Sequence, residues 1–192
     1  MTLPATHRYA RGFTLIELMV TLVVLAALLT TAVPGFLGFR RNAELTGAAN
    51  RLVGAINAAR SEAMKRNRFA MVLPIGGERW TQGWVVFVDT NDNQAFDDGD
   101  VLVMRQEPLP PYLGVAGTGP AAGGMAHIRY DGSGFSRPLG GNVANATLSL
   151  SRTDVPSDAS QVRRIVIART GRIRVCTPKS LADAACSAGS AD

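Results

Sequence analysis

The sequence predicts an α+β protein in which one long N-terminal helix packs on an antiparallel β-sheet. Two observations support this prediction. An apolar run from Leu18 to Phe39 contains no charged side chain and leads into a stretch with helical periodicity. From Phe69 onward the chain instead shows short β-branched and aromatic runs separated by Gly, Pro, Asn and Asp, which is the pattern of strands and turns.

The apolar run is long enough to cross a bilayer, which takes about 20 apolar residues. Residues 1–12 before it carry Arg8 and Arg11 and no acidic residue, and basic residues flank membrane helices on the cytoplasmic side. The alternative is a secretory signal cleaved within the alanine-rich residues 26–32. Glu17 argues against that alternative, because a carboxylate in an apolar helix is costly and is usually retained for a partner. The other interpretation of Glu17 is a side chain that reaches the lipid headgroups.

A stripe of apolar residues at spacings of three and four follows the apolar run and predicts an amphipathic helix that covers a sheet. Its members are Leu45, Ala49, Leu52, Ile56, Ala59 and Ala63. Both stretches together predict a single helix from Phe13 to about Arg66, about 80 Å long at 1.5 Å per residue.

Seven short runs after the helix are expected to form strands. They are residues 69–73, 84–88, 101–104, 127–130, 146–150, 163–168 and 172–176. The second and third should pair as a hairpin. Residues 109–124 are rich in Pro, Gly and Ala, so an irregular loop is expected there. The sequence shows no internal repeat and no sign of a second globular domain.

The segment Gly12-Phe13-Thr14-Leu15-Ile16-Glu17, followed by the apolar helix, resembles the type III signal of type IV pilins and pseudopilins. The resemblance implies that a prepilin peptidase cuts after Gly12 and methylates the new amino terminus on Phe13. It also implies that Glu17 pairs with the N-terminal amine of a neighbouring subunit, in keeping with the need of a buried carboxylate for a cation.

Three segments follow from this resemblance. Residues 1–12 would be a cleaved leader, residues 13–39 the transmembrane and filament-core half of the helix, and residues 40–192 a periplasmic pilin-like domain that includes the amphipathic half. The implied shape is a lollipop. The implied location is the bacterial inner membrane, with a single span, and then a pilus or pseudopilus built through contacts between the N-terminal helices.

The order of the elements also resembles the GspH/FimT branch of this superfamily. A long helix runs into Ala59-Arg60-Ser61-Glu62-Ala63, a strand follows, and then comes Gly83-Trp84-Val85-Val86-Phe87-Val88-Asp89. Members of this branch are minor pseudopilins of type II secretion or minor pilins of type IV pili.

The two cysteines, Cys176 and Cys186, lie near the C-terminus. In an exported chain this spacing predicts a disulfide that closes a short loop, with a contribution of about 2–3 kcal/mol to stability. A zinc site is disfavoured, because two thiols without nearby His or further Cys cannot complete a zinc shell.

Residues 89–100 match part of a calcium-loop pattern. Oxygen-bearing side chains stand at positions one, three, five and nine: Asp89, Asn91, Asn93 and Asp97. Gln94, however, replaces the glycine of the sharp turn, and Asp100 replaces the bidentate glutamate. We therefore favour a polar hairpin tip and expect no metal or other cofactor, with calcium as the weaker alternative.

Enzymatic motifs are not apparent. His127 has no evident Cys or Ser partner, and His7 belongs to the predicted leader. Residues 117–119 lack the Gly-Lys-Ser/Thr of a phosphate-binding loop. We expect a protein that is not an enzyme, so energy for filament assembly must come from another protein.

Six cations and no acid lie between residues 163 and 179, in a chain of net charge +5. They are Arg163, Arg164, Arg169, Arg172, Arg174 and Lys179. Thr170-Gly171 predicts a turn, after which Arg172 and Arg174 should project from one face, about 7 Å apart by strand rise, with Ile173 and Val175 toward the core. Such a face suits the phosphates of double-stranded DNA without reading its sequence. The alternative is a solvated face whose arginines pair with Asp154, Asp158 or Asp183.

Gly171-Arg172-Ile173-Arg174 resembles the Gly-Arg-x-Arg motif of FimT-type minor pilins that bind DNA during natural transformation. The resemblance implies a minor pilin of a type IV pilus that captures extracellular double-stranded DNA through these basic residues. The alternative is a GspH-like minor pseudopilin with a structural role at the tip of a type II secretion pseudopilus. Either interpretation implies prepilin peptidase and other pilins as partners.

Overall fold

The computed structural model of the chain describes residues 12–140 and 143–187, apart from the side chains of residues 31–34. Most of the predicted leader, residues 1–11, lies outside the described residues. The chain forms two compact units that divide between Arg41 and Asn42.

Helix α1 runs from Leu15 to Arg66 and contributes to both units. These bounds agree with the predicted helix. In the first unit, the large apolar side chains of this helix that the structure describes are exposed. Within the described residues no single helix meets the length and composition criteria for a membrane span, whereas the segments Leu15–Thr30 and Gly35–Arg66 meet them as a pair.

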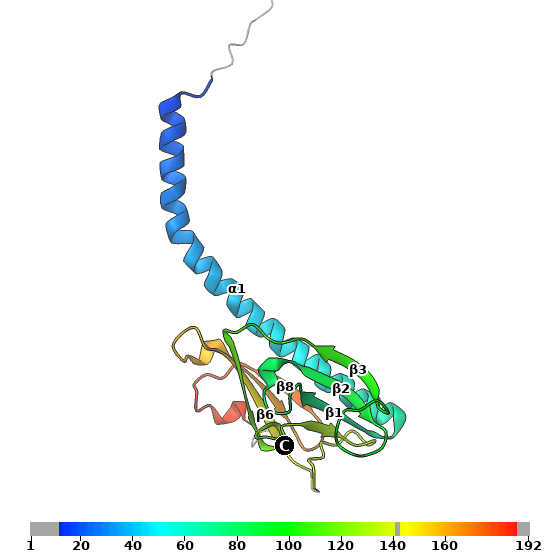
Figure 1. Cartoon of the computed structure of the whole chain (residues 1–192). Coiled ribbons are helices and arrows are strands. Elements are labelled where there is room, and N and C mark those ends of the chain that lie inside the picture. The colour runs from blue at the N-terminus through cyan, green and yellow to red at the C-terminus, as the bar shows by residue number, and fades with distance from the viewer. Residues whose placement is uncertain (1–11, 141–142, 188–192) are drawn as a thin grey trace, which may run out of the picture. The chain divides into compact units, whose positions relative to one another are not determined.

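Among the described residues of the second unit, eight strands form two antiparallel four-stranded sheets, and Figure 1 labels several of these strands. Sheet A has the order β3 (Val101–Gln106), β2 (Trp84–Asp89), β1 (Phe69–Pro74), β5 (Ile128–Tyr130). Sheet B has the order β4 (Leu113–Thr118), β6 (Ala146–Arg152), β7 (Val162–Ile167), β8 (Ile173–Cys176). Four 3-10 turns complete the described elements: Trp80–Gln82, Gly119–Ala121, Ala159–Gln161 and Ala184–Cys186. The predicted hairpin of β2 and β3 is confirmed.

The second half of α1 packs on the inner faces of both sheets and makes one continuous core with them. Every member of the predicted apolar stripe is at most 1% exposed. Five alanines (Ala48, Ala49, Ala55, Ala59 and Ala63) are among the buried helix residues. Because alanine is small, the sheets can approach the helix backbone closely. All residues of this core lie between Leu45 and Ile167, so the second unit has a complete core of its own, and we expect residues 42–192 to fold alone.

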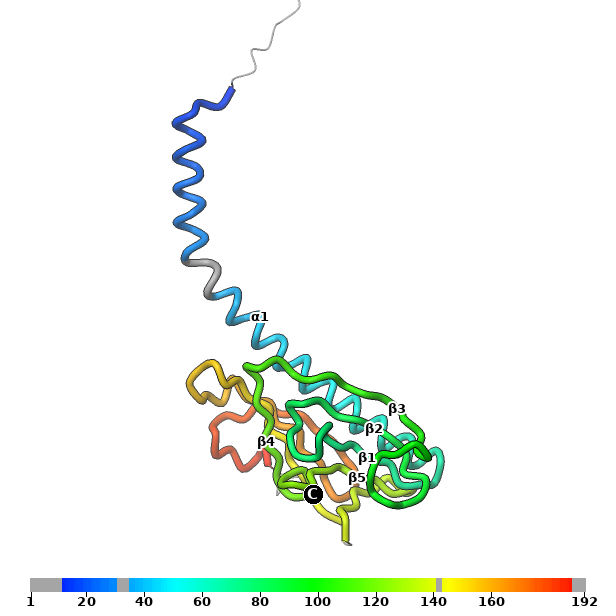
Figure 2. Tube along the Cα trace, viewed as in Figure 1, coloured from blue at the N-terminus to red at the C-terminus, as the bar shows by residue number. Residues whose placement is uncertain are grey.

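Strand β4 corrects the prediction of an irregular loop over residues 109–124. Leu113–Thr118 pairs with β6 along its whole length, and β4 is labelled in the trace of the chain (Figure 2). The glycines of β4 weaken the sequence pattern that predicts a strand. Glycine is nevertheless required at position 117, because a Cβ there would overlap the backbone of Ala121. Close backbone approach is a common reason for glycine in a strand.

Sheet A has apolar residues on its outer face as well, away from α1. Met71, Val85 and Phe87 form a second buried cluster there. The hairpin tip between β2 and β3 folds over this face, and Phe96 packs against Phe87 with ring centroids 5.3 Å apart. Buried Arg129 lies over the ring of Phe69 and forms an ion pair with Asp92 of the same tip.

Candidate functional site

The predicted processing and assembly residues surround the start of α1. Gly12 and Phe13 precede the helix, and Glu17 lies in its first turn. The hydroxyl of Thr14 accepts a hydrogen bond from the backbone N–H of Glu17, at 3.3 Å. Thr14 is therefore the N-cap, and the Thr-x-x-Glu spacing is the sequence signal that identifies such a cap. A carboxylate in the first turn also suits the positive end of the helix dipole.

The C-terminal cations are organised by the β7–β8 hairpin. Gly171 makes its turn at φ +82°, with its N–H donating to the carbonyl of Ala168 at 2.8 Å. Ala168 in turn donates to the carbonyl of Arg172, and Arg174 stands opposite Val166. Residues that stand opposite each other in paired strands point to the same face of the sheet, and every second residue along a strand points to that face again. Arg172 and Arg174 therefore project from the outer face of sheet B, as predicted.

Two of the six cations on this segment hold the loop that follows β8. The Arg164 guanidinium donates to the carbonyls of Leu181, Asp183 and Cys186 at 2.5, 3.1 and 3.2 Å. The Arg174 guanidinium donates to the carbonyl of Ala185 at 2.7 Å. These acceptors are carbonyls, which carry no formal charge, so these bonds fix the loop without neutralising the guanidinium groups.

The remaining cations differ in position. Arg172, Arg169 and Lys179 are exposed. Within the described part of the chain, the side chain of Arg172 makes no hydrogen bond or ion pair. Arg163 belongs to the opposite face of β7 and donates to the carbonyls of Ser160 and Val162, so the structure does not bring it to the same surface.

The disulfide between Cys176 and Cys186 is present in the structure, as predicted, with 6.0 Å between the Cα atoms. The disulfide closes a loop, and the Asp183 carboxylate stabilises this loop. It accepts hydrogen bonds from the backbone N–H groups of Lys179 and Ala185 at 2.9 and 3.0 Å. The Lys179 N–H, aided by the charges of Lys179 and Arg164, lowers the pKa of Asp183 below its usual range.

The alternative prediction was that Asp154, Asp158 or Asp183 neutralises the arginines of this face. Two of these three acids have other partners in the structure. Asp154 forms an ion pair with Arg152 at 2.8 Å, and Asp158 accepts the N–H of Ser160. Asp183 is the acid that lies among the basic residues.

Val175 lies on the inner face of sheet B, as predicted, since it stands opposite the core residue Ile165, but its side chain is 42% exposed and is not packed in the core. β8 is an edge strand that pairs with β7 alone, so the core beneath it ends before Val175. Ile173 is partly buried against the core.

Sequence reasoning also missed Arg60. Its Nε donates to the carbonyl of Gly134 and its Nη2 donates to the carbonyl of Thr170, at 3.1 and 3.4 Å. No local pattern links these residues, which are far apart in the sequence.

The hairpin tip at residues 89–100 shares one backbone feature with a calcium loop, a positive φ at its sixth position, but it has an internal set of hydrogen-bond donors. Gln94 adopts φ +67°, the conformation for which such a loop uses glycine. The side-chain amides of Asn91 and Asn93 both donate to Asp97, at 3.0 and 2.5 Å. Their oxygens already accept the backbone N–H groups of Asn93 and Ala95, so amide nitrogens face Asp97 where a calcium ion would need oxygens. The Asn91 amide is the main reason that the pKa of Asp97 is lowered.

We predict that calcium stabilises a variant of this tip and not the wild type. Replacing Asn91→Asp together with Asn93→Asp removes two donors and adds two carboxylates. Calcium at about a hundredfold excess over its Kd should then raise the Tm of the variant by about 5 °C or more. Thermal unfolding in calcium, magnesium or chelator measures this. A comparable rise for the wild type in calcium would instead identify a native calcium site.

A helix that leads from an N-terminal methylation signal into a head of two antiparallel sheets defines a type IV pilin or pseudopilin. The chain belongs to the GspH family, since residues 48–171 match the family model described as type II transport protein GspH. Residues 7–33 match the prokaryotic N-terminal methylation motif. The predicted superfamily, its GspH/FimT-like branch and the α+β fold are thus confirmed.

Known relatives agree with this assignment. The chain is 29% identical over 178 residues to the pilin-like protein PilA1 of Thermus thermophilus, covering 86% of this chain and 97% of PilA1. A crystal structure of the type IV minor pilin FimU of Pseudomonas aeruginosa matches with a TM-score of 0.55 at 18% identity, covering 74% of this chain and 98% of that chain. A second crystal form of FimU gives 0.54 at 17% identity, with 70% and 98% covered. At this identity the FimU structures show a shared fold.

Proposed function

We propose that this pilin-like protein is a minor subunit of a type IV pilus that captures extracellular double-stranded DNA through the outer face of its β7–β8 hairpin. The N-terminal signal supports cleavage after Gly12 by a prepilin peptidase, methylation of Phe13, and residence in the inner membrane before assembly. Glu17 and the exposed apolar half of α1 would then pack against other pilins. The role is structural and binding rather than enzymatic.

The observation that supports DNA capture best is the arrangement of three guanidinium groups on one face. Arg172 is exposed beside a rigid glycine turn, while Arg164 and Arg174 lie on the same face and remain charged. A disulfide-closed loop held by those two arginines keeps the surface in place. Phosphate oxygens are the natural acceptors for such an array, and contacts to them do not depend on base sequence.

In this proposal the predicted DNA-binding residues have different roles. Arg172, Arg169 and Lys179 are exposed and would contact phosphates directly. Arg164 and Arg174 add positive potential while they position the loop, and Arg163 lies on the other face. A first test should therefore avoid Arg174, because its loss would also release the loop.

Duplex DNA binding by residues 42–192 tests the proposal. We expect binding to duplexes of unrelated sequence, and we expect Arg172→Ala to weaken it about three- to tenfold at low salt. The slope of log K against log salt should become shallower by about 0.9 for one lost phosphate contact. Arg172→Lys keeps the charge and should preserve most of the salt slope. Arg51→Ala, an exposed arginine on α1, is the matched control.

The second candidate function is a structural role in a type II secretion pseudopilus, favoured by the description of the matching family model. In that case the basic face would contact another pseudopilin. Failure of the wild-type domain to bind DNA at low salt, or equal binding by wild type and Arg172→Ala, would rule out the DNA proposal and favour this second role.

A further inference from the structure

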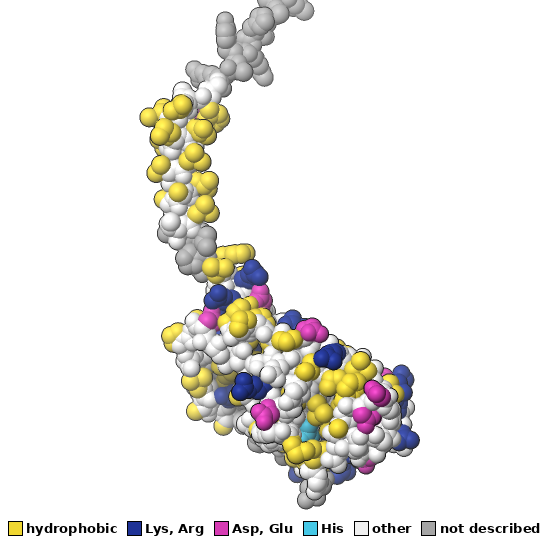
Figure 3. Space-filling view, in the orientation of Figure 1, with side chains coloured by type: hydrophobic (Ala, Val, Ile, Leu, Met, Phe, Trp, Pro, Cys, Tyr) yellow, Lys and Arg dark blue, Asp and Glu magenta, His cyan; other side chains and the backbone are white. Residues whose placement is uncertain are grey.

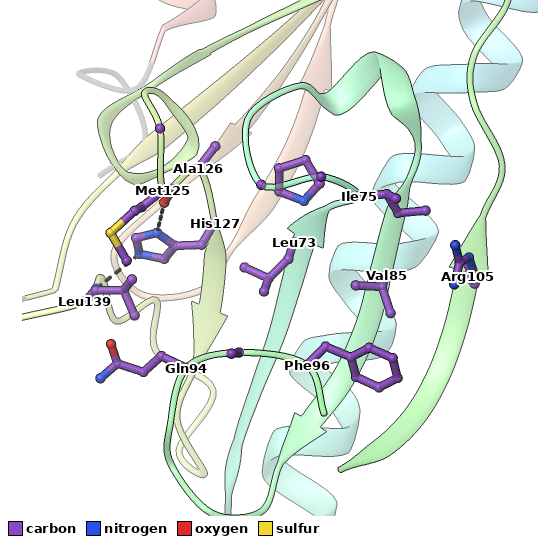
Figure 4. A pocket seen from close by; sticks show the side chains of 15 residues that line it. Leu73, Ile75, Val85, Gln94, Phe96, Arg105, Met125, Ala126, His127 and Leu139 are labelled. Atoms are coloured by element: carbon purple, nitrogen blue, oxygen red, sulfur yellow. Dashed lines mark hydrogen bonds between the residues drawn. The ribbon is translucent and has the colours of Figure 1, made fainter. Parts of the chain in front are cut away.

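A pocket of about 360 Å³ opens on the outer face of sheet A (Figure 4), on the side away from α1. Leu73 of β1 and Val85 of β2, which are paired across the two strands, form its floor. Ile75, Phe96 and Leu139 contribute apolar walls. This volume is within the usual range for small-molecule sites, about 300–1,000 Å³.

The pocket exists because two strands stop pairing. β1 and β5 pair only from Ala70 to Val72, opposite Tyr130 to Ile128. Beyond that point residues 124–127 leave the sheet and form one side of the pocket, as Figure 4 shows. Because Phe96 packs against Phe87 on the outer face of the sheet, the hairpin tip is held at the other side of the pocket.

His127 lines the pocket without offering it a free polar atom. Its Nδ1 is 2.7 Å from the carbonyl of Met125, and its Nε2 accepts the backbone N–H of Leu139 at 3.1 Å. This pair of contacts places the proton on Nδ1, and burial lowers the pKa of His127. The imidazole is thus neutral, and both of its nitrogens already have hydrogen-bond partners. The ring therefore contributes only its surface to the wall of the pocket.

Arg105 supplies the charge of the pocket. It stands on β3 directly opposite Val85, so its side chain shares the outer face with the apolar floor, and it lines the pocket. Arg105 is exposed, and within residues 12–140 and 143–187 its guanidinium makes no hydrogen bond or ion pair. Figure 4 shows Arg105 at one side and the Gln94 amide at the opposite side, with Leu73 and Val85 between them.

The rim of the pocket is also apolar. Met125 is 71% exposed and Phe96 is 41% exposed, and Figure 3 shows apolar side chains gathered on this face around the histidine. Exposed apolar groups that surround a concave site commonly mark a binding surface. An apolar floor with one unpaired cation at its side suits a ligand that is apolar along its body and anionic at one end.

We propose that this pocket binds a small anionic amphiphile, a single acyl chain or ring that bears a carboxylate. The apolar body lies on Leu73 and Val85, and the carboxylate pairs with Arg105, a charge-assisted contact for which guanidinium geometry is well suited. This site lies on the other sheet from the basic hairpin and does not depend on the DNA proposal.

Dodecanoate, kept below its micelle-forming concentration, is the probe for residues 42–192. We expect saturable NMR shifts of the Leu73, Val85 and Leu139 methyl groups, and none at Leu148 in the core. Dodecanol, which shares the chain but lacks the charge, should bind about tenfold more weakly. Arg105→Gln should weaken dodecanoate binding about tenfold while leaving dodecanol binding unchanged.

Two further variants complete the test. Ala95→Phe places a ring at the pocket and should abolish binding of both probes, whereas Arg51→Gln on α1 should leave both affinities unchanged. Since Arg105 is exposed, its variant retains the fold and keeps the test decisive if Ala95→Phe unfolds. Absence of saturable shifts, or equal affinities of dodecanoate and dodecanol for the wild type, would overturn the proposal.

Discussion

Gly171→Ala is expected to lower the free energy of unfolding by about 2–5 kcal/mol. The residue has φ +82°, where an alanine costs about 1–2 kcal/mol. A Cβ there would also overlap the carbonyl oxygen of Gly134 and lie 2.9 Å from Nε of Arg60. Relieving such an overlap in a packed site typically costs a further 1–3 kcal/mol. Urea unfolding of residues 42–192 measures the sum.

Gly123→Ala is the matched control for this prediction. Gly123 has nearly the same backbone angle, φ +81°, but nothing lies within 4 Å of its Cβ position. Gly123→Ala should therefore lower the free energy of unfolding only by the cost of an alanine in this backbone conformation, about 1–2 kcal/mol. If both variants lose equal stability, the close packing of Gly171 against Gly134 contributes nothing. The glycine of the Gly-Arg-x-Arg motif would then be explained by its turn alone.

Removing the disulfide with Cys176→Ser and Cys186→Ser is expected to lower the free energy of unfolding by about 2–3 kcal/mol, the chain-entropy value for a loop of this size. The backbone N–H groups of Lys179 and Ala185, which donate to Asp183, should also lose protection from hydrogen exchange as the loop opens more often. Urea unfolding and hydrogen exchange together separate the global effect from the local one.

Reductant provides the control for the disulfide prediction. It should destabilise the wild type to the level of the double variant and leave the variant itself unchanged. Arg164 and Arg174 still offer four hydrogen bonds to carbonyls of the loop after the crosslink is gone. Unchanged stability in the variant would therefore mean that these bonds, and not the crosslink, hold the loop.

The long-range framework was predictable because it depends on periodicity. The stripe from Leu45 to Ala63 repeats at helical spacing, so its burial followed directly from the sequence. Strand β4 was not predictable, since glycines at 114 and 117 hide a strand whose pairing with β6 is decided by close backbone packing. The division of strands between two sheets likewise depends on tertiary contacts that a local pattern does not contain.

The candidate site was predictable only in outline. Alternation along β8 correctly placed Arg172 and Arg174 on one face, and the cysteine spacing predicted the disulfide. The roles of Arg164 and Arg174 in holding the loop were not predictable, because their acceptors are backbone carbonyls, which are the same in every sequence. The pocket beside Arg105 also escaped sequence reasoning, since it results from the point at which β1 and β5 stop pairing.

The buried stripe on α1 has a mechanical consequence. The chain enters the head through this helix, so a pull along the helix axis is applied to all of its buried side chains at the same time. Under this force the contacts of the helix cannot break one after another, as the hydrogen bonds of an edge strand do when the strand is pulled from its sheet. The helix must slide past both sheets in shear. A head anchored in this way resists a force that is applied along the axis of its N-terminal helix.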